Sequence, residues 1–371
     1  MRAEEPSPVK RHSGKGHAVT MWEVAKSSGF SPATVSIVLN NAPLARYIAS
    51  ATKKRIEETA KKLGYRPNAM ARFLRSKRSH SVGVMLFDVT DPFCAPILRG
   101  IENALYQSSY VPIFADAHNQ KSRFEHCLEM LLEHHVEALI VVANWLFVDI
   151  QLLADLSKRN ITAATICWEV PGDSVSSVIV DNEAGGRLAL EHLYHLGHRK
   201  IAFIRGPKML IDSAPRWKGT QKFAHSVGLE IDPSLVVQLP DVWDPNSGFE
   251  GGYRLTEELL QRKKKFTALM AFDDLTAMGT IRALTKAGMK VPEHCSVVGF
   301  DDVPLSAMAA PSLTTIRQPL EAMGNLAVNT VMEGINAGLE KRDWSISRHK
   351  VSPELVIRDS TRAAALTGSN D

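Results

Sequence analysis

The chain has 371 residues, of which 44% are apolar and 23% are charged. These fractions are close to those of ordinary globular proteins and exclude collagen-like, coiled-coil and wholly disordered chains. The length allows two or three domains.

Residues 1–17 are polar and basic and contain no apolar core. We therefore expect no secretory signal, but a disordered basic tail on a cytoplasmic protein. The longest apolar runs, such as Ala138–Ala143, have the length of a strand. A membrane-spanning helix needs about 20 apolar residues, so we expect none, and no membrane partner.

The charge is unevenly distributed along the chain. Residues 1–80 hold 16 Lys or Arg and 5 Asp or Glu, a net charge of +11, whereas the remaining residues have a net charge of −7. A basic segment joined to a mildly acidic body is typical of a nucleic-acid-binding head on a domain with another task. A solvated basic tail would give the same count, so charge alone leaves both interpretations open.

The basic segment begins with a predicted helix. Thr20 and Glu23 have the spacing of a capping box, in which each side chain bonds to the backbone amide of the other residue. The helix is expected to end near Ser28, where Gly29 allows a sharp turn and Phe30 can plug the core.

Two more helices are predicted after the turn. Ser31 and Pro32 supply an N-cap and a first helical residue for a helix that runs to about Leu39. A third helix is predicted over 50–63, with Gly64 as its C-cap. Two short helices joined by a glycine-containing turn are typical of a helix-turn-helix domain, whose second helix enters the major groove of DNA. Short polar side chains on its outer face suit phosphates and base edges, namely Ser31, Thr34, Ser36 and Asn40.

Beyond Ser81 the chain alternates short apolar runs with helical stretches. The predicted strands are Val82–Phe87, Val111–Ala115, Ala138–Val142, Ala163–Cys167, Ser177–Val180, Ile201–Ile204, Ala268–Phe272 and Ser296–Phe300. The predicted helices lie near 94–108, 121–135, 149–159, 183–196, 215–228, 247–264 and 274–288. Such βα repeats indicate parallel sheets covered by helices.

So many strands predict two lobes, because a single sheet of that size would be unusual. We place the boundary near Asp181, which divides the βα units into two sets. Ligands of such folds bind outside the carboxyl ends of the strands, so a ligand would lie in the cleft between the lobes. The predicted fold is an all-α helix-turn-helix head followed by a two-lobed α/β domain.

Several motifs together resemble the LacI/GalR family of bacterial transcriptional regulators. They include the run 24–40 with its Gly29-Phe30-Ser31-Pro32 turn, the segment Gly64-Tyr65-Arg66-Pro67-Asn68, and later Asp91-Pro92-Phe93, Val180-Asp181-Asn182, Gly197-His198-Arg199-Lys200, Phe272-Asp273-Asp274 and Gly299-Phe300-Asp301-Asp302. The resemblance covers about residues 18–360. It implies a DNA-binding domain at 18–66, a hinge helix and linker at 67–80, and a periplasmic-binding-protein-like effector and dimerisation domain at 81–360. We expect a flexible tail at 361–371.

The resemblance implies which residues contact DNA. In this family the hinge helix folds when two subunits lie side by side on an operator, and a leucine from each hinge enters a minor-groove step and kinks the duplex. The matching residue is Leu74. Besides the four polar residues above, the implied DNA contacts are Thr20, Pro32, Ala33, Ile37, Asn68, Ala71 and Leu74.

Two departures from the family pattern concern the operator. Ile37 stands where the family often has arginine, so a direct guanine contact is missing there. The segment 41–49 is longer than in the shortest members, and we assign no contact to Arg46 or Tyr47.

The resemblance also implies the effector contacts. Phe93 would stack on the ligand, Arg216 would hold it and Asp301 would bind it from the opposite strand end. A guanidinium with a carboxylate and aromatic faces suits a polyhydroxylated or charged small molecule, such as a sugar or a related metabolite. For Asp273 and Asp274, ligand binding and helix capping are equally good interpretations. Trp145 and Trp168 either shape the pocket or pack in the core.

Neither metal binding nor catalysis is predicted. Four dispersed cysteines without CxxC spacing favour reduced thiols over disulfides or zinc. His192, His195 and His198 lack further ligands at metal spacing, so we expect a surface helix and propose no metal or cofactor. The chain has no nucleophile elbow, P-loop or GxGxxG motif after a strand, and we expect no enzyme.

These observations predict a repressor that binds a palindromic operator as a homodimer and responds to a small-molecule effector. A tetramer, and the choice between inducer and corepressor, remain open. Two other classes remain as alternatives. A solute-binding protein would function without residues 1–80, and an α/β enzyme acting on a sugar or nucleotide would show turnover.

Overall fold

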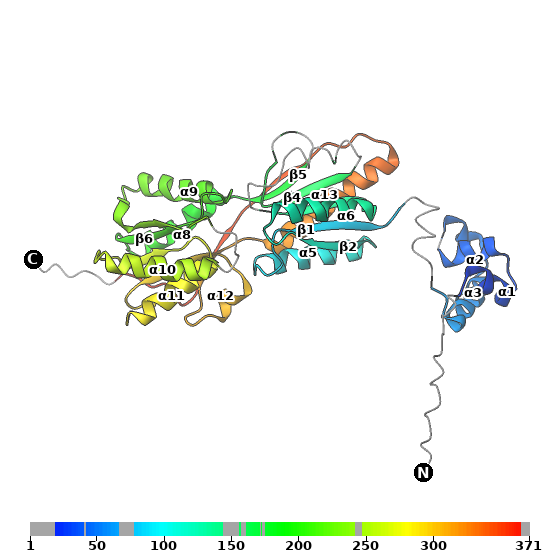
Figure 1. Cartoon of the computed structure of the whole chain (residues 1–371), viewed down its shortest axis with the longest axis horizontal. Helices are drawn as coiled ribbons and strands as arrows, with labels where there is room; N and C mark the ends of the chain where they lie inside the picture. The colour runs from blue at the N-terminus through cyan, green and yellow to red at the C-terminus, as the bar shows by residue number, and fades with distance from the viewer. Residues whose placement is uncertain are drawn as a thin grey trace, which may run out of the picture. The chain divides into compact units, whose positions relative to one another are not determined.

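The computed structural model describes residues 19–40, 42–66, 78–143, 156, 161–170, 172, 175–241 and 247–364. The chain divides into two compact units between Ser79 and His80 (Figure 1). The first unit is helical, and the second contains all the strands assigned among the described residues.

The first unit has the predicted helix-turn-helix order. Its elements are α1 (Met21–Ser28), α2 (Pro32–Leu39), the 3₁₀ helix η1 (Pro43–Tyr47) and α3 (Ser50–Leu63). The Thr20 capping box, the Ser31 N-cap and the left-handed C-caps at Gly29 and Gly64 are all present, so these sequence predictions are confirmed. η1 lies in the segment that is longer than in short family members.

A small apolar core holds these helices together. Its fully buried side chains come from all three α-helices, namely Val24, Ala25, Val35, Val38, Ile56 and Ala60. Phe30 is partly buried against this core, and the guanidinium of Arg55 lies 5.5 Å from the centre of its ring. The turn between α1 and α2 is thereby fixed to α3, which positions α2 rigidly.

The second unit contains two six-stranded sheets. The first has the order β11-β5-β4-β3-β1-β2 and the second β12-β10-β9-β8-β6-β7. Among the described residues, every strand pairing is parallel except that of β10 with β12, which is antiparallel. The strands are β1 (Ser81–Leu86), β2 (Val111–Asp116), β3 (Ala138–Val142), β4 (Thr162–Ile166), β5 (Ser176–Val180), β6 (Ile201–Arg205), β7 (Val236–Gln238), β8 (Ala268–Met270), β9 (Ser296–Asp301), β10 (Thr314–Arg317), β11 (Arg348–Val351) and β12 (Glu354–Val356).

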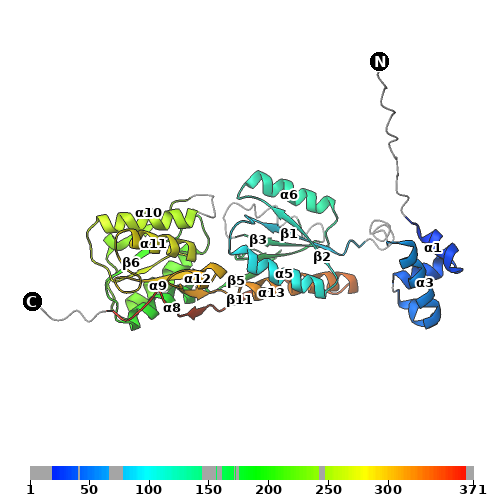
Figure 2. The same ribbon diagram turned by 90° about the horizontal axis from the view of Figure 1, so that it is seen from below.

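Helices cover both faces of each sheet (Figures 1 and 2). In the first lobe α6 packs on one face, and α5 and α13 pack on the other. In the second lobe α8 and α9 share one face, while α10 and α11 share the opposite one. The helices are α5 (Cys94–Gln107), α6 (Lys121–Glu133), α8 (Asn182–His195), α9 (Ser213–Ser226), the 3₁₀ helix η2 (Pro233–Leu235), α10 (Ser247–Gln261), α11 (Asp274–Lys286), α12 (Pro304–Met308) and α13 (Leu320–Glu340). The predicted helix at 149–159 lies almost entirely outside the described residues.

α5 and α13 approach each other closely because both carry glycine at the crossing. A Cβ atom added at Gly100 would lie 2.0 Å from the backbone oxygen of Glu321. A Cβ at Gly324 would lie 2.3 Å from the backbone oxygen of Ile97. Any larger residue at either site would push the two helices apart.

The lobes are not two consecutive halves of the chain. The predicted division near Asp181 is where the chain first passes from one lobe to the other, but the chain passes between lobes twice more. After β10 it returns to the first lobe, where α13 packs on α5 and β11 pairs with β5. It then re-enters the second lobe as β12. Sequence patterns alone did not predict β7, β10, β11, β12, α12 and α13. The four strands have only three or four residues each, too few to show a clear hydrophobic period.

The last described residues are also better ordered than predicted. Residues 361–364 were assigned to a flexible tail, but the backbone amide of Ala364 donates to the oxygen of Leu196 over 2.7 Å. The backbone oxygen of Arg362 lies 3.0 Å from Nε2 of His198. These residues are therefore part of the second lobe.

No helix among the described residues is long and apolar enough to cross a membrane.

Candidate functional site

The outer face of α2 is the candidate DNA-reading surface. Ser31 and Ala33 are exposed, and Pro32, Thr34, Ser36, Ile37 and Asn40 are partly exposed. The predicted residues of this helix therefore share one accessible face, which Val35 and Val38 anchor from behind.

The polar groups of this face are bonded to one another within the chain. The hydroxyls of Ser31 and Thr34 lie 2.9 Å apart, and the Asn40 amide donates to the Ser36 backbone oxygen over 2.7 Å. The Thr20 hydroxyl donates to Glu23 over 2.8 Å. On binding DNA, these groups would exchange their local bonds for bonds to phosphates or base edges. Without DNA, the local bonds satisfy the groups and leave them accessible.

The helices that pack on α2 expose several basic side chains. Lys54, Arg55, Lys61 and Lys62 of α3 are exposed, as is Lys26 of α1. In η1 the guanidinium of Arg46 donates to the Tyr47 hydroxyl over 2.7 Å and lies over the tyrosine ring, 4.7 Å from its centre. Tyr47 is 71% exposed, so it does not cover the core. The implied hinge contacts Asn68, Ala71 and Leu74 lie outside the described residues.

The second candidate site is a cavity where strands of both lobes end. It contains about 780 Å³ of empty space, part of it open to solvent. Its lining comes from segments at the carboxyl ends of the strands and from the helix ends that follow them, namely Phe87, Asp91, Pro92, Phe93, Pro207, Leu210, Asp212, Arg216, Leu239, Ser247, Gly248, Phe272, Asp273, Asp274, Leu275, Asp301, Val303 and Gln318.

Arg216 is a buried cation at the wall of this cavity. Its guanidinium lies between two rings, 3.5 Å from the centre of Phe300 and 4.5 Å from that of Phe272. It donates to Oδ1 of Asn182 over 3.0 and 3.1 Å and to the backbone oxygen of Phe272 over 2.6 Å. The Asp212 carboxylate is 4.0 Å away. Arg216 is only 4% exposed, so its guanidinium belongs to the buried wall of the cavity.

Five carboxyl groups line the cavity, those of Asp91, Asp212, Asp273, Asp274 and Asp301. Burial raises the pKa of Asp91 to about 7, while a hydrogen bond from the Phe93 amide opposes the shift. Burial also raises the pKa of Asp273 and that of Asp301. The neighbouring acids Asp273 and Asp274 raise the pKa of Asp301 further, and only Arg216 and the amide of Gln318 oppose them.

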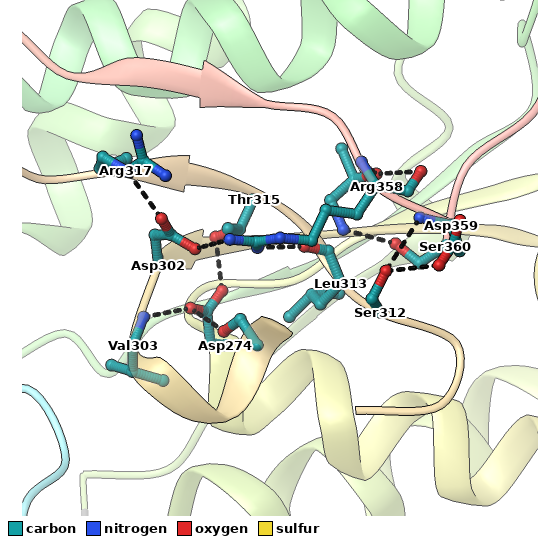
Figure 3. Close-up of polar contacts among 12 residues, drawn as sticks. Asp274, Asp302, Val303, Ser312, Leu313, Thr315, Arg317, Arg358, Asp359 and Ser360 are labelled. Atoms are coloured by element: carbon teal, nitrogen blue, oxygen red, sulfur yellow. Dashed lines mark hydrogen bonds and ion pairs between the residues drawn. The ribbon is translucent and has the colours of Figure 1, made fainter. Parts of the chain in front are cut away.

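The two consecutive acids of the Phe272-Asp273-Asp274 motif have different roles. Asp273 caps α11 by accepting from the Thr276 amide over 2.7 Å, and it also lines the cavity. Asp273 therefore both caps the helix and lines the cavity. Asp274 is buried, and its carboxylate accepts from Thr315 over 2.5 Å, Ser306 over 2.6 Å and the Val303 amide over 3.0 Å (Figure 3). It mainly ties α11 to the segments that follow β9 and to β10.

The aromatic candidates lie in different environments. Phe93 precedes α5 and lines the cavity, where its ring can form part of the wall. Trp168 is 5% exposed and packs in the core between α6 and the first sheet, away from the cavity lining. Trp145 lies outside the described residues. The structure thus brings Phe93, Arg216, Asp273 and Asp301 together and leaves Trp168 in the core.

Asp91, Asp212 and Gln318 line the cavity but were not among the predicted ligand contacts. Asp91 follows β1, and Gln318 directly follows β10. The rule that ligands bind beyond the carboxyl ends of parallel strands could have found Asp91. It could not have found Gln318, because β10 was not recognised as a strand.

An ion-pair cluster connects the cavity wall to the passages between lobes (Figure 3). Asp302 follows β9 and accepts from Arg317 over 2.7 Å and from Arg358 over 2.5 Å. Arg317 ends β10, just before the second passage, and Arg358 follows β12, after the third. The adjacent Asp301 accepts from Gln318 over 2.6 Å.

The histidines singled out in the sequence are explained by packing. His195 is exposed on α8, as expected for a surface helix, but His192 and His198 are buried, which corrects the prediction for these two. His198 lies 2.8 Å from the Thr267 hydroxyl and 3.1 Å from that of Ser296, and His192 lies 3.0 Å from that of Thr361. Burial lowers the pKa of both imidazoles. Cys94, Cys167 and Cys295 are buried, and Cys127 is half-buried.

Comparisons with known proteins identify the family of both units. The family described as "Bacterial regulatory proteins, lacI family" matches residues 20–68, and the "Periplasmic binding protein-like domain" matches residues 190–361. The chain is 32% identical over 350 residues to the HTH-type transcriptional repressor PurR of Haemophilus influenzae strain PittEE, with 93% of this chain and 99% of that protein covered.

Two solved structures extend the likeness to the whole chain. A lac repressor dimer bound to operator and the anti-inducer ONPF has 27% identity and a TM-score of 0.78, and the match covers 94% of this chain and all of that one. A complex of the transcriptional regulator CelR with cellobiose has 26% identity and a TM-score of 0.67, and the match covers 92% of this chain and 99% of that one. The chain therefore belongs to the LacI family of bacterial transcriptional regulators, and it is a DNA-binding regulator and not an enzyme.

Proposed function

We propose that this protein is a homodimeric repressor of transcription whose affinity for a two-fold symmetric operator is set by a small molecule in the cavity. The proposal rests on one observation, that a single chain contains both a DNA-binding head and a unit with a cavity. A helix-turn-helix head presents an accessible α2, and a two-lobed unit holds a cavity with a buried guanidinium and carboxyl groups.

On the DNA side, α2 would lie in the major groove with its exposed N-terminal turn near a phosphate. Ser31 begins the helix, and free backbone amides of a first helical turn favour an anion. Ser36 and Asn40 lie further along the same accessible face, where they can reach base edges. Asn68, Ala71 and Leu74 would supply the hinge contacts in the minor groove.

On the effector side, Phe93, Arg216, Asp273 and Asp301 would form the site, and a sugar or related metabolite would be the ligand. The ligand would bridge the two lobes, because Phe93 belongs to the first and the other three to the second. Trp168 is dropped from the proposed contacts.

Coupling between the two sites would be thermodynamic. An effector shifts the operator-binding population only as far as its affinity differs between the binding and non-binding arrangements. The chain passes between the lobes three times. A ligand that contacts both lobes and changes their arrangement would therefore act on all three connections. We place this regulation in the cytoplasm, where the DNA of a bacterium is found.

The proposal is tested by selecting bound duplexes from random DNA with the purified full-length protein at about 150 mM salt, where sequence-independent phosphate binding is weakened. We expect a two-fold symmetric site of about 14 to 20 base pairs, since two recognition helices lie about one helical turn apart. Recovery of unrelated sequences, both with and without an added extract of bacterial metabolites, would contradict the proposal.

Matched variants connect the selected site to α2. Ser36→Ala removes a hydroxyl from the proposed reading face and should weaken binding to the selected site about fivefold or more. Thr59→Ala serves as the control, since its hydroxyl only bonds back to the Arg55 oxygen within α3, over 2.7 Å. An equal loss in both variants would indicate a folding defect and not a DNA contact.

A further inference from the structure

The second unit carries a cluster of positive charge that neither candidate site uses. Five exposed basic residues lie on two short segments of the second lobe, and we call them the basic edge, namely Arg199, Lys200, Lys263, Lys264 and Lys265. The segments 199–200 and 263–267 contain no acidic residue. Residues 81–371 hold 28 basic and 35 acidic residues, a net charge of −7, so the part of the unit outside the basic edge has a net charge of −12.

The fold places the two segments side by side. Residues 199–200 lead into β6, and residues 263–267 lead into β8, which pairs with β6. The amide of Thr267 donates to the Lys200 oxygen over 2.9 Å, and the His198 ring lies 2.8 Å from the Thr267 hydroxyl. Because three consecutive residues span at most about 10 Å and adjacent strands lie about 4.8 Å apart, the five residues share an edge roughly 10 to 15 Å wide.

The basic edge is separate from the effector cavity. It lies at the amino ends of β6 and β8, whereas Pro207 and Phe272, which line the cavity, follow the carboxyl ends of these strands. The chain enters the second unit from the head at His80, before the amino end of β1 in the other lobe. The edge is therefore also separate from the point where the head is attached.

The charges of the basic edge are not neutralised within the described part of the chain. No described carboxylate forms an ion pair with its four lysines, whereas the neighbouring Arg262 pairs with Glu258 over 2.5 Å. Arg199 lies over the Tyr194 ring, 3.8 Å from its centre, and its Nη1 donates to the backbone oxygens of Tyr194 and His198. These contacts hold the guanidinium in place and leave Nε and Nη2 for a ligand.

The stability of the fold explains only part of the cluster. A cation just beyond a helix C-terminus interacts favourably with the helix dipole, which accounts for Lys263 after α10 and for Arg199, which bonds a carbonyl in the last turn of α8. Lys200, Lys264 and Lys265 have no such partner, and like charges this close repel one another. An anionic partner would remove this repulsion.

The composition of the basic edge favours the phosphates of duplex DNA as that partner. Lysine is depleted in protein–protein interfaces. Phe266, the one large apolar residue of the two segments, is buried, so the edge offers no ring for stacking a single-stranded base and no apolar group for insertion into a membrane. Duplex DNA carries one negative charge per about 1.7 Å of its axis, or about six to nine charges over the width of the edge.

We propose that the basic edge is a second DNA-binding surface, which contacts the phosphates of a duplex without reading its sequence. A protein bound to its operator through the head would then hold a second DNA segment. Lys290 and Arg362 are exposed on neighbouring segments, but each is accompanied by an exposed acid, Glu293 and Asp359, and adds little net charge. This inference goes beyond the proposed function, because operator recognition does not require this surface.

The experiment measures two properties of the full-length protein, its binding to a labelled random duplex and its ability to bridge two duplexes. For bridging, a random duplex of about 30 base pairs is fixed to beads, and the protein and a labelled duplex are added at about 50 mM salt, where phosphate contacts are strong. The triple variant Lys263→Glu, Lys264→Glu, Lys265→Glu reverses the charge of most of the edge. We expect it to retain at least fivefold less labelled DNA than the wild type, and about 200 mM salt to abolish the bridging by the wild type.

A matched variant separates the basic edge from the net charge. Lys121→Glu, Lys208→Glu, Lys341→Glu makes the same change of charge at exposed lysines on three other segments. It should retain labelled DNA within about twofold of the wild type, because salt screens charges that are far from the bound duplex. A third variant, with glutamine at 263, 264 and 265, removes the charge without reversing it, and it replaces the first variant if the melting temperature of that one is lowered.

Equal behaviour of the wild type and the edge variants in both assays would overturn the inference. Binding of the edge to polyglutamate or to phosphatidylglycerol vesicles, without binding to duplex DNA, would overturn it as well and would assign the edge to an acidic protein or a membrane surface. A head that does not bind DNA would abolish bridging but leave binding to a single duplex, which the edge variants would lose. A failure of the proposed function is therefore distinguishable from a failure of this inference.

Discussion

Arg216 shows how a single residue can serve both the fold and the site. Its side chain is buried between two phenylalanine rings and bonded to Asn182, the first residue of α8, which follows the first passage between the lobes. The sequence could indicate a cation near the ligand, but not how its donors are distributed. That depends on residues 34 and 56 positions away in the chain.

We expect Arg216→Lys to lower the free energy of unfolding by about 3 kcal/mol. A lysine cannot reproduce the planar fork that bonds Asn182 and Phe272 together, so buried acceptors would lose their partners. Urea denaturation of the full chain measures the change. Arg187→Lys on the exposed face of α8 is the control and should change stability by less than about 0.5 kcal/mol. Equal stability of the two variants would show that the Arg216 network contributes nothing.

Asp91 predicts a pH dependence of stability. Its pKa is about 7 in the folded protein, above that of an unfolded aspartate, so the folded state holds this proton to a higher pH. The contribution of Asp91 to stability therefore falls as pH rises from about 4 to about 7. The neighbouring titratable groups Asp88, Asp273 and Cys94 do not reverse this sign, because Asp88 and Asp273 raise the pKa and burial keeps the Cys94 thiol protonated.

Asp91→Asn removes the ionisation and can keep the acceptor for the Phe93 amide. We expect the variant to be more stable than the wild type at pH 8, by about 1 to 4 kcal/mol, and to lose most of this advantage at pH 5. Urea denaturation at the two pH values measures the difference. A constant difference across this range would show that Asp91 does not titrate as described.

At the scale of elements, the head was predictable because its signals are local. The capping box, the Ser31-Pro32 start and the glycine C-caps each depend on residues within one helical turn, and the boundaries of α1, α2 and α3 were predicted to the residue. The edge strands were less predictable. β7 and β12 have three residues each, too few to show a hydrophobic period.

The crossing of α5 and α13 depends on glycine, and we expect Gly100→Ala to destabilise the second unit by about 2 kcal/mol or more. Its methyl group would meet the backbone of Glu321, which cannot move aside as a flexible side chain could. Gly338→Ala in α13, the helix that packs on α5, is the control. A Cβ there meets nothing within 4 Å, and alanine should raise stability by about 0.5 to 1 kcal/mol. Thermal unfolding of both variants measures the contrast, and a stable Gly100→Ala protein would contradict the close packing.

At the scale of the whole effector unit, the chain passes between the lobes three times. Asp302 forms ion pairs with Arg317, just before the second passage, and with Arg358, after the third. We expect Asp302→Asn to lower the free energy of unfolding by about 2 kcal/mol, since Arg358 is largely buried and would lose its anionic partner. Asp359→Asn is the matched control from the same cluster (Figure 3). Asp359 is exposed and accepts from the Ser312 hydroxyl over 2.6 Å, so its loss should cost less than about 1 kcal/mol. Denaturation of the two variants under one condition measures both losses. Equal losses would show that the Asp302 ion pairs do not stabilise the fold more than the exposed Asp359 contact does.

By itself the sequence determined the local structure and the class of protein. Helix caps, the apolar strand cores and the family motifs are encoded by neighbouring residues, so the helix-turn-helix head and the βα units could be predicted without a structure. Phe93, Arg216 and Asp301 were predicted from the resemblance to the LacI/GalR family, and Asp273 was predicted either as a ligand contact or as a helix cap.

Only the tertiary structure decided how distant segments combine. It placed α13 and β11 in the first lobe and β12 in the second, moved Trp168 from the candidate pocket to the core, and added Asp91, Asp212 and Gln318 to the cavity lining. These features depend on contacts between residues far apart in the chain, whose free energy no local pattern records. The cluster of acids in the cavity lining is of the same kind, since its members come from four separate segments and meet only in the folded protein.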